Sequence, residues 1–194
     1  MKVYDISQEV FSCSVYPGDP KPQKNLVLSI DDGSLYNLST ISMCAHNGTH
    51  IDAPYHFIND GKTVEQIDIN KFVGPCIVVT HSGVVTASDA ENILQSGSND
   101  ALKRILIKGD ATVSAEAATV FANNGIYLLG NESQTVGPDD APMEVHKILL
   151  KEDVVLLEGI RLDEVDDGEY ILCAAPLNLK GAEGSPCRAV LIEL

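Results

Sequence analysis

The segment His46-Asn-Gly-Thr-His-Ile-Asp-Ala-Pro-Tyr-His56 contains three of the five histidines of this 194-residue chain, together with an aspartate. Imidazole nitrogen and carboxylate oxygen are the ligands that zinc, manganese and similar divalent ions accept in proteins. A catalytic zinc site commonly uses three protein ligands and keeps one position open for chemistry. The segment therefore predicts a metal site with one further side chain left for proton transfer.

The spacing within the segment predicts which of its side chains converge. A glycine and a proline disfavour a continuous helix and leave an extended or looped backbone. In an extended chain His50 and Asp52 point to the same side. A turn at the Asn-Gly step can fold His46 back onto that side, while His56 approaches from the rim beyond the proline. Cys44, two residues before His46, is an alternative ligand.

Composition limits the classes of function open to the chain. Its length fits one compact domain and no stretch resembles a linker, so we expect residues 1–194 to form a single domain. The net charge of -15 argues against nucleic-acid and anionic-membrane partners. The N-terminal residues lack a secretory signal and no apolar run is long enough to cross a bilayer, which predicts a cytoplasmic protein. The five cysteines are scattered and odd in number, which disfavours a disulfide framework.

On both sides of the histidine-rich segment, apolar runs and turn residues predict an α/β fold. We expect strands at 3–6, 26–30, 38–43, 77–79, 102–107, 126–129, 154–157, 170–174 and 189–192, and helices at 88–94, 114–123 and 142–150. A capping box at Ser88–Glu91 is expected to begin the first helix. The chain thus predicts a mixed sheet with a β-rich N-terminal section and an alternating strand-helix middle, whose strands pair in parallel.

The histidine-rich segment resembles the His-x-Gly-Thr-His-x-Asp-x-Pro-x-His motif of the cyclase-like family of metal-dependent hydrolases, which includes bacterial kynurenine formamidase and isatin hydrolase. Tyr16-Pro-Gly-Asp19 is similar to the Trp-Pro-Gly-Asp of the formamidases, and Pro176-Leu-Asn-Leu-Lys-Gly-Ala-Glu-Gly-Ser-Pro-Cys-Arg188 is similar to their closing segment. The resemblance spans nearly the whole chain. It implies a single domain of the swivelling β/β/α type.

The resemblance also implies which residues form the site. The implied metal ligands are His46, His50, Asp52, His146 and Glu158. Asp52 would bridge toward a second ion, and His56 would act as proton donor and acceptor. The implied cofactor is one or two Zn²⁺ ions, with Mn²⁺ as the alternative. Without the family, His146 would be interpreted as a solvated helix residue and Glu158 as a carboxylate at a strand end.

The activity that the resemblance implies is hydrolysis of a carbon–nitrogen amide bond in a small molecule, most like that of kynurenine formamidase. Zinc lowers the pKa of a bound water to about 7, and an imidazole with a pKa near 6.5 can carry the proton. Tyr16, the expected substrate contact, replaces the tryptophan of the formamidases. Residues 130–136 read Gly-Asn-Glu-Ser-Gln-Thr-Val where the formamidases carry Gly-Ile-Asp-Thr-Pro-Ser-Val. We expect this segment to border the pocket, so a lactam or a cyclic imide is an alternative substrate.

Other hypotheses stay open at this stage. A metal-binding module without catalysis is one, and a metal-dependent cyclase or dehydratase is another. The chain has neither a phosphate-binding glycine loop nor a Gly-x-Ser-x-Gly elbow, and Ser185 is interpreted as a turn residue. The aromatic candidates for a substrate pocket are Tyr16, Tyr36, Tyr55 and Phe57. The family resemblance implies a homodimer or homotetramer, with Tyr16 and Pro17 where a neighbouring chain would meet the pocket.

Overall fold

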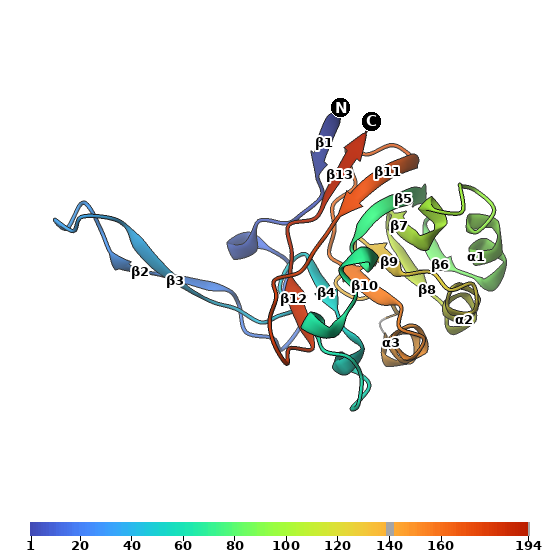
Figure 1. Cartoon of the computed structure of the whole chain (residues 1–194), viewed down its shortest axis with the longest axis horizontal. Coiled ribbons are helices and arrows are strands. Elements are labelled where there is room, and N and C mark those ends of the chain that lie inside the picture. The colour runs from blue at the N-terminus through green and yellow to red at the C-terminus, as the bar shows by residue number, and fades with distance from the viewer. Residues whose placement is uncertain (139–141, 194) are drawn as a thin grey trace.

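The computed structural model describes residues 1–138 and 142–193 and is built on a nine-stranded mixed sheet, in the order β1-β13-β11-β5-β7-β9-β10-β4-β12 (Figure 1). Its strands are β1 (Lys2–Asp5), β4 (His50–Asp52), β5 (Val73–Thr80), β7 (Arg104–Lys108), β9 (Leu128–Asn131), β10 (Val155–Glu158), β11 (Gly168–Cys173), β12 (Gly184–Pro186) and β13 (Val190–Glu193). β5, β7, β9 and β10 are parallel, and the outer strands pair antiparallel. The predicted α/β class with a parallel middle is confirmed.

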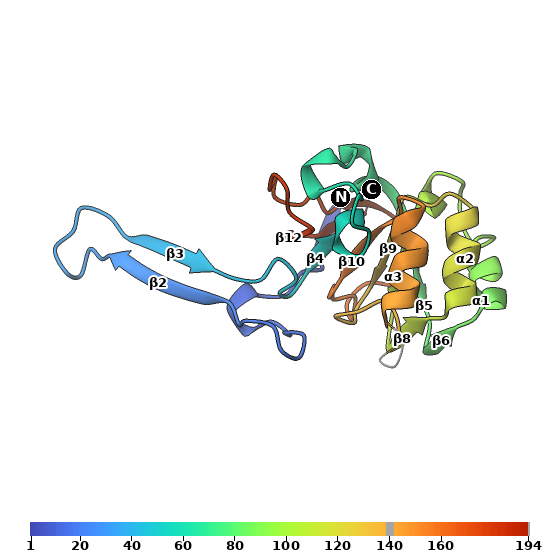
Figure 2. The same ribbon diagram turned by 90° about the horizontal axis from the view of Figure 1, so that it is seen from below.

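Helices cover one face of this sheet. They are α1 (Ala87–Ile93), α2 (Ala115–Asn123) and α3 (Pro142–Lys151), and all three lie on the same side (Figure 2). Alternate residues of β7 divide between two cores. Ile105 and Ile107 pack in the core that contains Phe121 of α2, and Leu106 packs in the core that contains Phe72. The sheet is therefore buried on both faces, as a parallel sheet requires.

Shorter elements complete the body. β6 (Gly83–Val85) and β8 (Ala111–Val113) form a separate parallel pair. Short 3-10 helices are η1 (Val10–Ser12), η2 (Pro54–His56), η3 (Val64–Gln66), η4 (Ile69–Lys71) and η5 (Ala101–Lys103). Among the described residues, no helix is long and apolar enough to cross a membrane.

A two-stranded hairpin projects from the body. β2 (Gln23–Leu28) and β3 (Leu38–Ser42) pair antiparallel with each other and form their own sheet. We call residues 23–42 the arm, and both views show it extending away from the rest of the molecule (Figures 1 and 2). The two strands were predicted, but their separation from the main sheet was not.

Two local predictions were wrong. The capping box lies at Thr86 and Asp89, where the Thr86 N–H donates to Asp89 Oδ2 at 2.9 Å and the Asp89 N–H donates to Thr86 Oγ1 at 3.3 Å. The helix begins earlier than Ser88 because β6 ends at Val85 and leaves Thr86 as the first extended residue able to cap it. Ser185 is a buried strand residue of β12, and its Oγ accepts from the Leu177 N–H at 3.0 Å.

Candidate metal centre

The histidine-rich segment places its side chains through strand β4. β4 lies between β10 and β12, with His50 opposite Glu158 and Asp52 opposite Gly184. His50 and Asp52 are two residues apart on this strand and therefore share a face. A left-handed turn at Gly48, with φ 66, brings His46 back toward them. His46 Nδ1 consequently lies 2.8 Å from Asp52 Oδ1.

Helix α3 and strand β10 bring two more side chains to the same place. His146 Nε2 lies 3.1 Å from Glu158 Oε1 and 3.6 Å from Asp52 Oδ2. Glu158 Oε2 lies 3.5 Å from His50 Nε2. The potential ligand atoms form two sets, each with all atoms within 4.8 Å of one another: His46, His50 and Asp52, and Asp52, His146 and Glu158. All five predicted ligands thus converge, and Asp52 belongs to both sets.

Burial gives this cluster unusual electrostatics. The side chains of Asp52 and Glu158 are only 1% and 3% exposed. Burial opposes a charge on His50, but its hydrogen bonds with these two carboxylates outweigh that effect and raise the pKa of His50 to about 10. Burial likewise opposes a charge on Asp52, yet bonds from His46 and His50 hold the pKa of Asp52 well below its ordinary value. The neighbouring histidines therefore keep the buried Asp52 carboxylate ionised.

These residues fit a divalent cation. A pair of buried carboxylates is costly unless a cation compensates it. His50 Nδ1 donates to the Gly48 carbonyl at 2.9 Å, which orients the ring and leaves Nε2 as the atom facing the carboxylates. His46 Nε2 is buried and makes no hydrogen bond within the described part of the chain. Imidazole and carboxylate donors in this arrangement are those that zinc and manganese accept.

His56 lies against the cluster but in neither ligand set. It ends η2, and its ring stacks on that of His46 with 4.1 Å between centroids. The Phe57 ring contacts it edge-on, at 4.3 Å. Burial, together with the neighbouring His46 and His146, lowers the pKa of His56 even though Asp52 opposes the shift. The ring is therefore neutral at neutral pH and able to accept a proton.

A cavity of about 320 Å³ opens onto these side chains. Tyr16 and Phe57 contribute aromatic surface to it, as predicted, whereas Tyr36 and Tyr55 do not line it. Tyr36 does not line the cavity because it lies on the arm, between β2 and β3. Cys44 lines the cavity outside both ligand sets, and its Sγ donates to Asp19 Oδ2 at 3.6 Å.

The segment predicted to border the pocket does so. Gln134 and Thr135 line the cavity. Gln134 Oε1 and Thr135 Oγ1 are buried, and neither makes a hydrogen bond to any described residue. Buried polar atoms without a protein partner are uncommon, and in a cavity wall they indicate contact with a ligand or water.

Sequence reasoning assigned no role to two neighbours of His46 in the closing segment. Glu183 Oε1 lies 3.5 Å from His46 Nε2. A Cβ atom on Gly184 would lie 2.5 Å from His46 Cε1, so glycine is needed there for the imidazole to occupy its position. The glycine-rich pattern of the segment was the signal that could have found this contact. His81 is outside the site and lies 3.4 Å from the Val84 carbonyl.

Known proteins are similar to this chain over most of its length. The family model described as "Putative cyclase" matches residues 4–138. A kynurenine formamidase of Bacillus anthracis is 35% identical over 204 residues, covering 98% of this chain and 97% of the relative. One of Erythrobacter litoralis is 31% identical over 207 residues, covering 100% and 94%.

Solved structures share the fold. A structure described as a potential metal-dependent hydrolase with cyclase activity has a TM-score of 0.82 and 30% identity, covering 98% of this chain and 96% of its own. Isatin hydrolase A from Labrenzia aggregata has a TM-score of 0.84 at 22% identity, covering 98% and 93%. At 22% identity, the similarity to isatin hydrolase A concerns the fold alone.

Proposed function

This chain belongs to the cyclase family of metal-dependent hydrolases, and we propose that it is an amidohydrolase of the kynurenine formamidase type, which converts N-formylkynurenine and water to kynurenine and formate. The observation that carries the proposal is the pair of buried carboxylates, Asp52 and Glu158, enclosed by three histidines. The relatives at 31–36% identity over almost the full length support the reaction class.

We propose that His46, His50 and Asp52 hold one zinc ion and that Asp52, His146 and Glu158 hold a second, with manganese as the alternative metal. When bound, such an ion activates water and polarises the substrate carbonyl. The chain orients the ligands through fixed contacts of its own. The His50 ring is held by the Gly48 carbonyl, and Glu158 Oε1 accepts from the Val136 N–H at 2.7 Å.

His56 is the residue we propose for proton transfer. Hydrolysis moves one proton from the attacking water to the departing amine nitrogen. A neutral imidazole has one nitrogen with a free lone pair, so His56 can accept the first proton and then donate it. Stacking on His46 and contact with Phe57 fix the plane of the ring next to the cluster.

Substrate recognition is proposed for the cavity walls. Its volume of about 320 Å³ suits a small molecule. Tyr16 and Phe57 offer faces on which an aromatic ring can pack. Thr135 Oγ1 and Gln134 Oε1 offer polar contacts that the protein itself leaves unused. Because both residues depart from the formamidase pattern, they are also where a lactam or cyclic imide specificity would arise.

The test is hydrolysis of N-formylkynurenine by metal-stripped protein and by protein reloaded separately with zinc and with manganese. We expect turnover only after reloading. His56→Ala should lower kcat by about 10²- to 10⁴-fold with unchanged metal content, and His81→Ala, outside the site, should not. Turnover without metal, or full activity of His56→Ala, contradicts the proposal. Metal-dependent hydrolysis of isatin but not of N-formylkynurenine would assign the substrate to the cyclic imides and lactams.

A further inference from the structure

Gln134 brings an amide group to the wall of the site cavity, at a position where the formamidase pattern has a proline. Its Nε2 donates to the Gly48 carbonyl at 3.3 Å. Its Oε1 is buried and makes no hydrogen bond with any described residue. A proline side chain has neither group. This chain therefore carries a polar function in its cavity that the formamidase pattern does not provide.

The orientation of the Gln134 amide follows from its neighbour. The Gly48 carbonyl can only accept hydrogen bonds, and it also lies 2.9 Å from His50 Nδ1. Turning the amide over would place two oxygens, Gln134 Oε1 and that of Gly48, against each other. Nε2 therefore faces the carbonyl, and Oε1 is the atom that stays unpaired. A carboxamide oxygen has lone pairs and no hydrogen, so the group that it lacks is a donor.

The backbone around Gln134 is held on both sides. The Glu132 carboxylate accepts from two backbone N–H groups, at 2.6 and 2.9 Å. The Val136 N–H donates to Glu158, a proposed metal ligand, at 2.7 Å. A Cβ atom on Gly159 would lie 2.3 Å from Gln134 Nε2, so glycine is needed there for the amide to occupy its position. These contacts keep Oε1 in the cavity wall, where a bound molecule can supply the donor.

The Gln134 amide lies next to the candidate metal centre. It bonds to the same carbonyl oxygen as the His50 ring, that of Gly48, and both side chains line the site cavity. A substrate amide that directs its carbonyl oxygen toward the ligand atoms has its N–H as the other polar group of the reacting amide. That N–H loses its water partner when the cavity encloses it, so it needs an acceptor. The carboxylates of Asp52 and Glu158 belong to the two ligand sets, whereas Gln134 Oε1 is an acceptor outside them.

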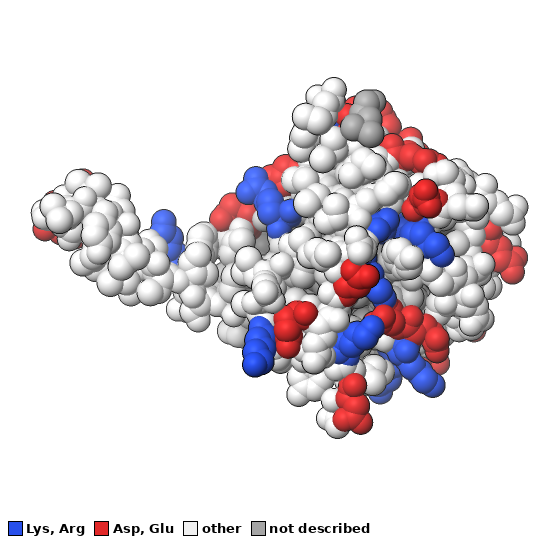
Figure 3. Space-filling model, in the orientation of Figure 1, with Lys and Arg blue, Asp and Glu red and all other residues white. Residues whose placement is uncertain are grey.

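Charge gives the cavity little else with which to select a substrate. Its lining, within the described part of the chain, contains no lysine or arginine. On the face shown in Figure 3, basic side chains lie beside acidic ones over the body and form no broad basic patch. The cavity wall therefore distinguishes small molecules by hydrogen bonds and shape more than by charge.

We propose that Gln134 determines specificity by accepting a hydrogen bond from the N–H of the scissile amide. The inference rests on the proposed function and narrows its substrates to secondary amides, including lactams and cyclic imides with a free N–H. Esters and N-substituted amides offer no donor at this place and leave Oε1 buried and unpaired. A site that pairs with a substrate N–H rejects an analogue without it for this reason.

The test uses two substrates that differ at one atom. Formanilide has an N–H beside the formyl carbon, and phenyl formate has an oxygen there. Gln134→Met keeps nearly the length of the side chain and removes both of its polar atoms. In zinc-loaded protein it should lower kcat/KM for formanilide by about tenfold or more and change that for phenyl formate by less than about twofold. Each substrate is compared with itself, so the greater intrinsic reactivity of the ester cancels.

Gln8→Met is the matched control. Gln8 also lies beside Gly159, but its Nε2 donates to the Gly159 carbonyl at 2.7 Å and its Oε1 accepts from the Ser14 N–H at 2.8 Å. Both polar atoms are used within the chain, so we expect Gln8→Met to change the two substrates by the same factor. Zinc content is measured in both variants. An equal loss on both substrates in Gln134→Met, with less bound zinc, would mean that Gln134 only positions Gly48 and His50, and it overturns the inference.

A binding measurement separates failure of this inference from failure of the proposed function. Oxindole carries a lactam N–H and N-methyloxindole does not, and calorimetry on zinc-loaded protein compares their affinities without turnover. Wild type should prefer oxindole, and Gln134→Met should reduce that preference by about tenfold. If wild type hydrolyses neither formanilide nor phenyl formate, the proposed function fails, and the binding pair still decides the role of Oε1. Equal affinities in wild type, or an unchanged preference in Gln134→Met, overturn the inference.

Discussion

The candidate metal centre and the arm are adjacent in the chain, yet they depart from ordinary burial in opposite directions. Only three residues separate Ser42, the last residue of β3, from His46. The centre buries charged side chains, with Asp52 1% exposed, and the arm exposes apolar ones, with Leu35 96% exposed. Buried polar groups and large exposed apolar surfaces are the two informative exceptions to the usual distribution.

The difference indicates how each region is stabilised. Buried carboxylates are compensated by positive charge, so the centre fits a cation. Exposed apolar side chains are stabilised by burial, and those of the arm gain little of it within the described chain. Within the described chain the centre already holds its groups in place through hydrogen bonds, whereas the strands of the arm are held by each other. The centre is thus held by contacts from several elements, whereas the arm is held by the pairing of its own two strands.

The largest effect is expected at the carboxylate shared by the two ligand sets. Asp52→Asn keeps the shape of the side chain and removes its charge, so we expect hydrolysis to fall by about 10³-fold or more, since metal contacts contribute several kcal/mol to catalysis. Zinc content, measured by elemental analysis, should fall as well. Glu91→Gln is the control, because Glu91 is exposed on α1 and belongs to neither set. Equal losses in both variants would contradict the special position of Asp52.

The same substitution in both regions should separate a packed side chain from an exposed one. Ile51→Ala removes a fully buried side chain between two proposed ligands, and we expect it to lower the free energy of unfolding by about 2–5 kcal/mol. Ile41→Ala on the arm, where Ile41 is 61% exposed, should change it by less than about 0.5 kcal/mol. Urea unfolding of both variants and of the wild type provides the comparison. Comparable losses would mean that the arm packs within its own chain.

The sequence predicted three of the five proposed ligands from spacing alone. His46, His50 and Asp52 lie within seven residues, so local geometry was enough to expect their convergence. His146 and Glu158 reach the same point only through the packing of α3 and the parallel pairing of β10 with β9. Such long-range contacts leave no periodic pattern in the local sequence. These two residues were predicted from the family resemblance. The unused polar atoms of Gln134 and Thr135 depend on side-chain geometry and required the structure.

The arm shows a different limit of sequence analysis. Its apolar residues predicted two strands correctly, because alternation and turn residues are local signals. That these strands would form a sheet separate from the main one was not predicted. An apolar pattern records which side chains avoid water, but not whether the surface that covers them belongs to the same chain. The structure was needed to show that β2 and β3 form a sheet of their own and do not join the main sheet.

A smaller effect is expected from the polar wall of the cavity. Thr135→Val removes a hydroxyl that makes no hydrogen bond within the described protein, so folding should not suffer. If Oγ1 contacts the substrate, kcat/KM should fall by roughly three- to tenfold, the value of about one neutral hydrogen bond. Thr40→Val on the arm is the matched control, and steady-state kinetics provide the comparison. An unchanged kcat/KM in Thr135→Val would mean that the hydroxyl does not contact the substrate.

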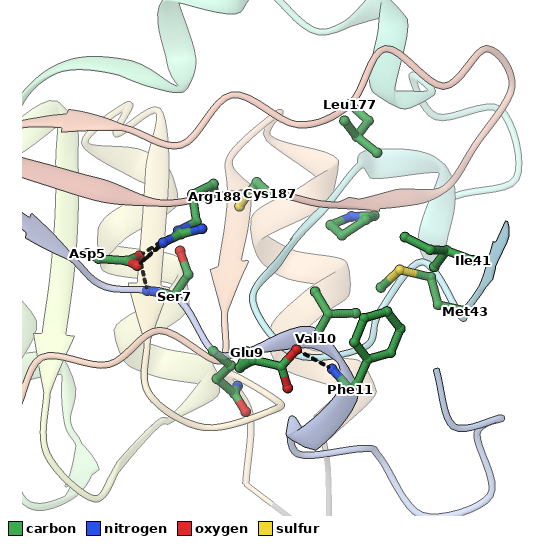
Figure 4. Close-up of a pocket in the computed structure, with 12 residues that line it drawn as sticks. Asp5, Ser7, Glu9, Val10, Phe11, Ile41, Met43, Leu177, Cys187 and Arg188 are labelled. Carbon is green, nitrogen blue, oxygen red and sulfur yellow. Dashed lines mark hydrogen bonds and ion pairs between the residues drawn. The ribbon is translucent and has the colours of Figure 1, made fainter. Parts of the chain in front are cut away.

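The smallest effect concerns the ion pair between Asp5 and Arg188, in the wall of a cavity of about 560 Å³ that Val10 and Phe11 also line (Figure 4). The Arg188 guanidinium holds the pKa of Asp5 below its ordinary value, against the opposing effect of partial burial. Because the folded-state pKa is the lower one, the pair stabilises the folded chain above the unfolded pKa of about 4 and stops doing so as the pH falls through the folded value. Asp5→Asn should therefore lower the urea unfolding midpoint slightly at neutral pH and not at strongly acidic pH. High salt should also remove the difference, since both side chains are exposed. A midpoint that Asp5→Asn leaves unchanged at neutral pH and low salt would contradict a stabilising role for the pair.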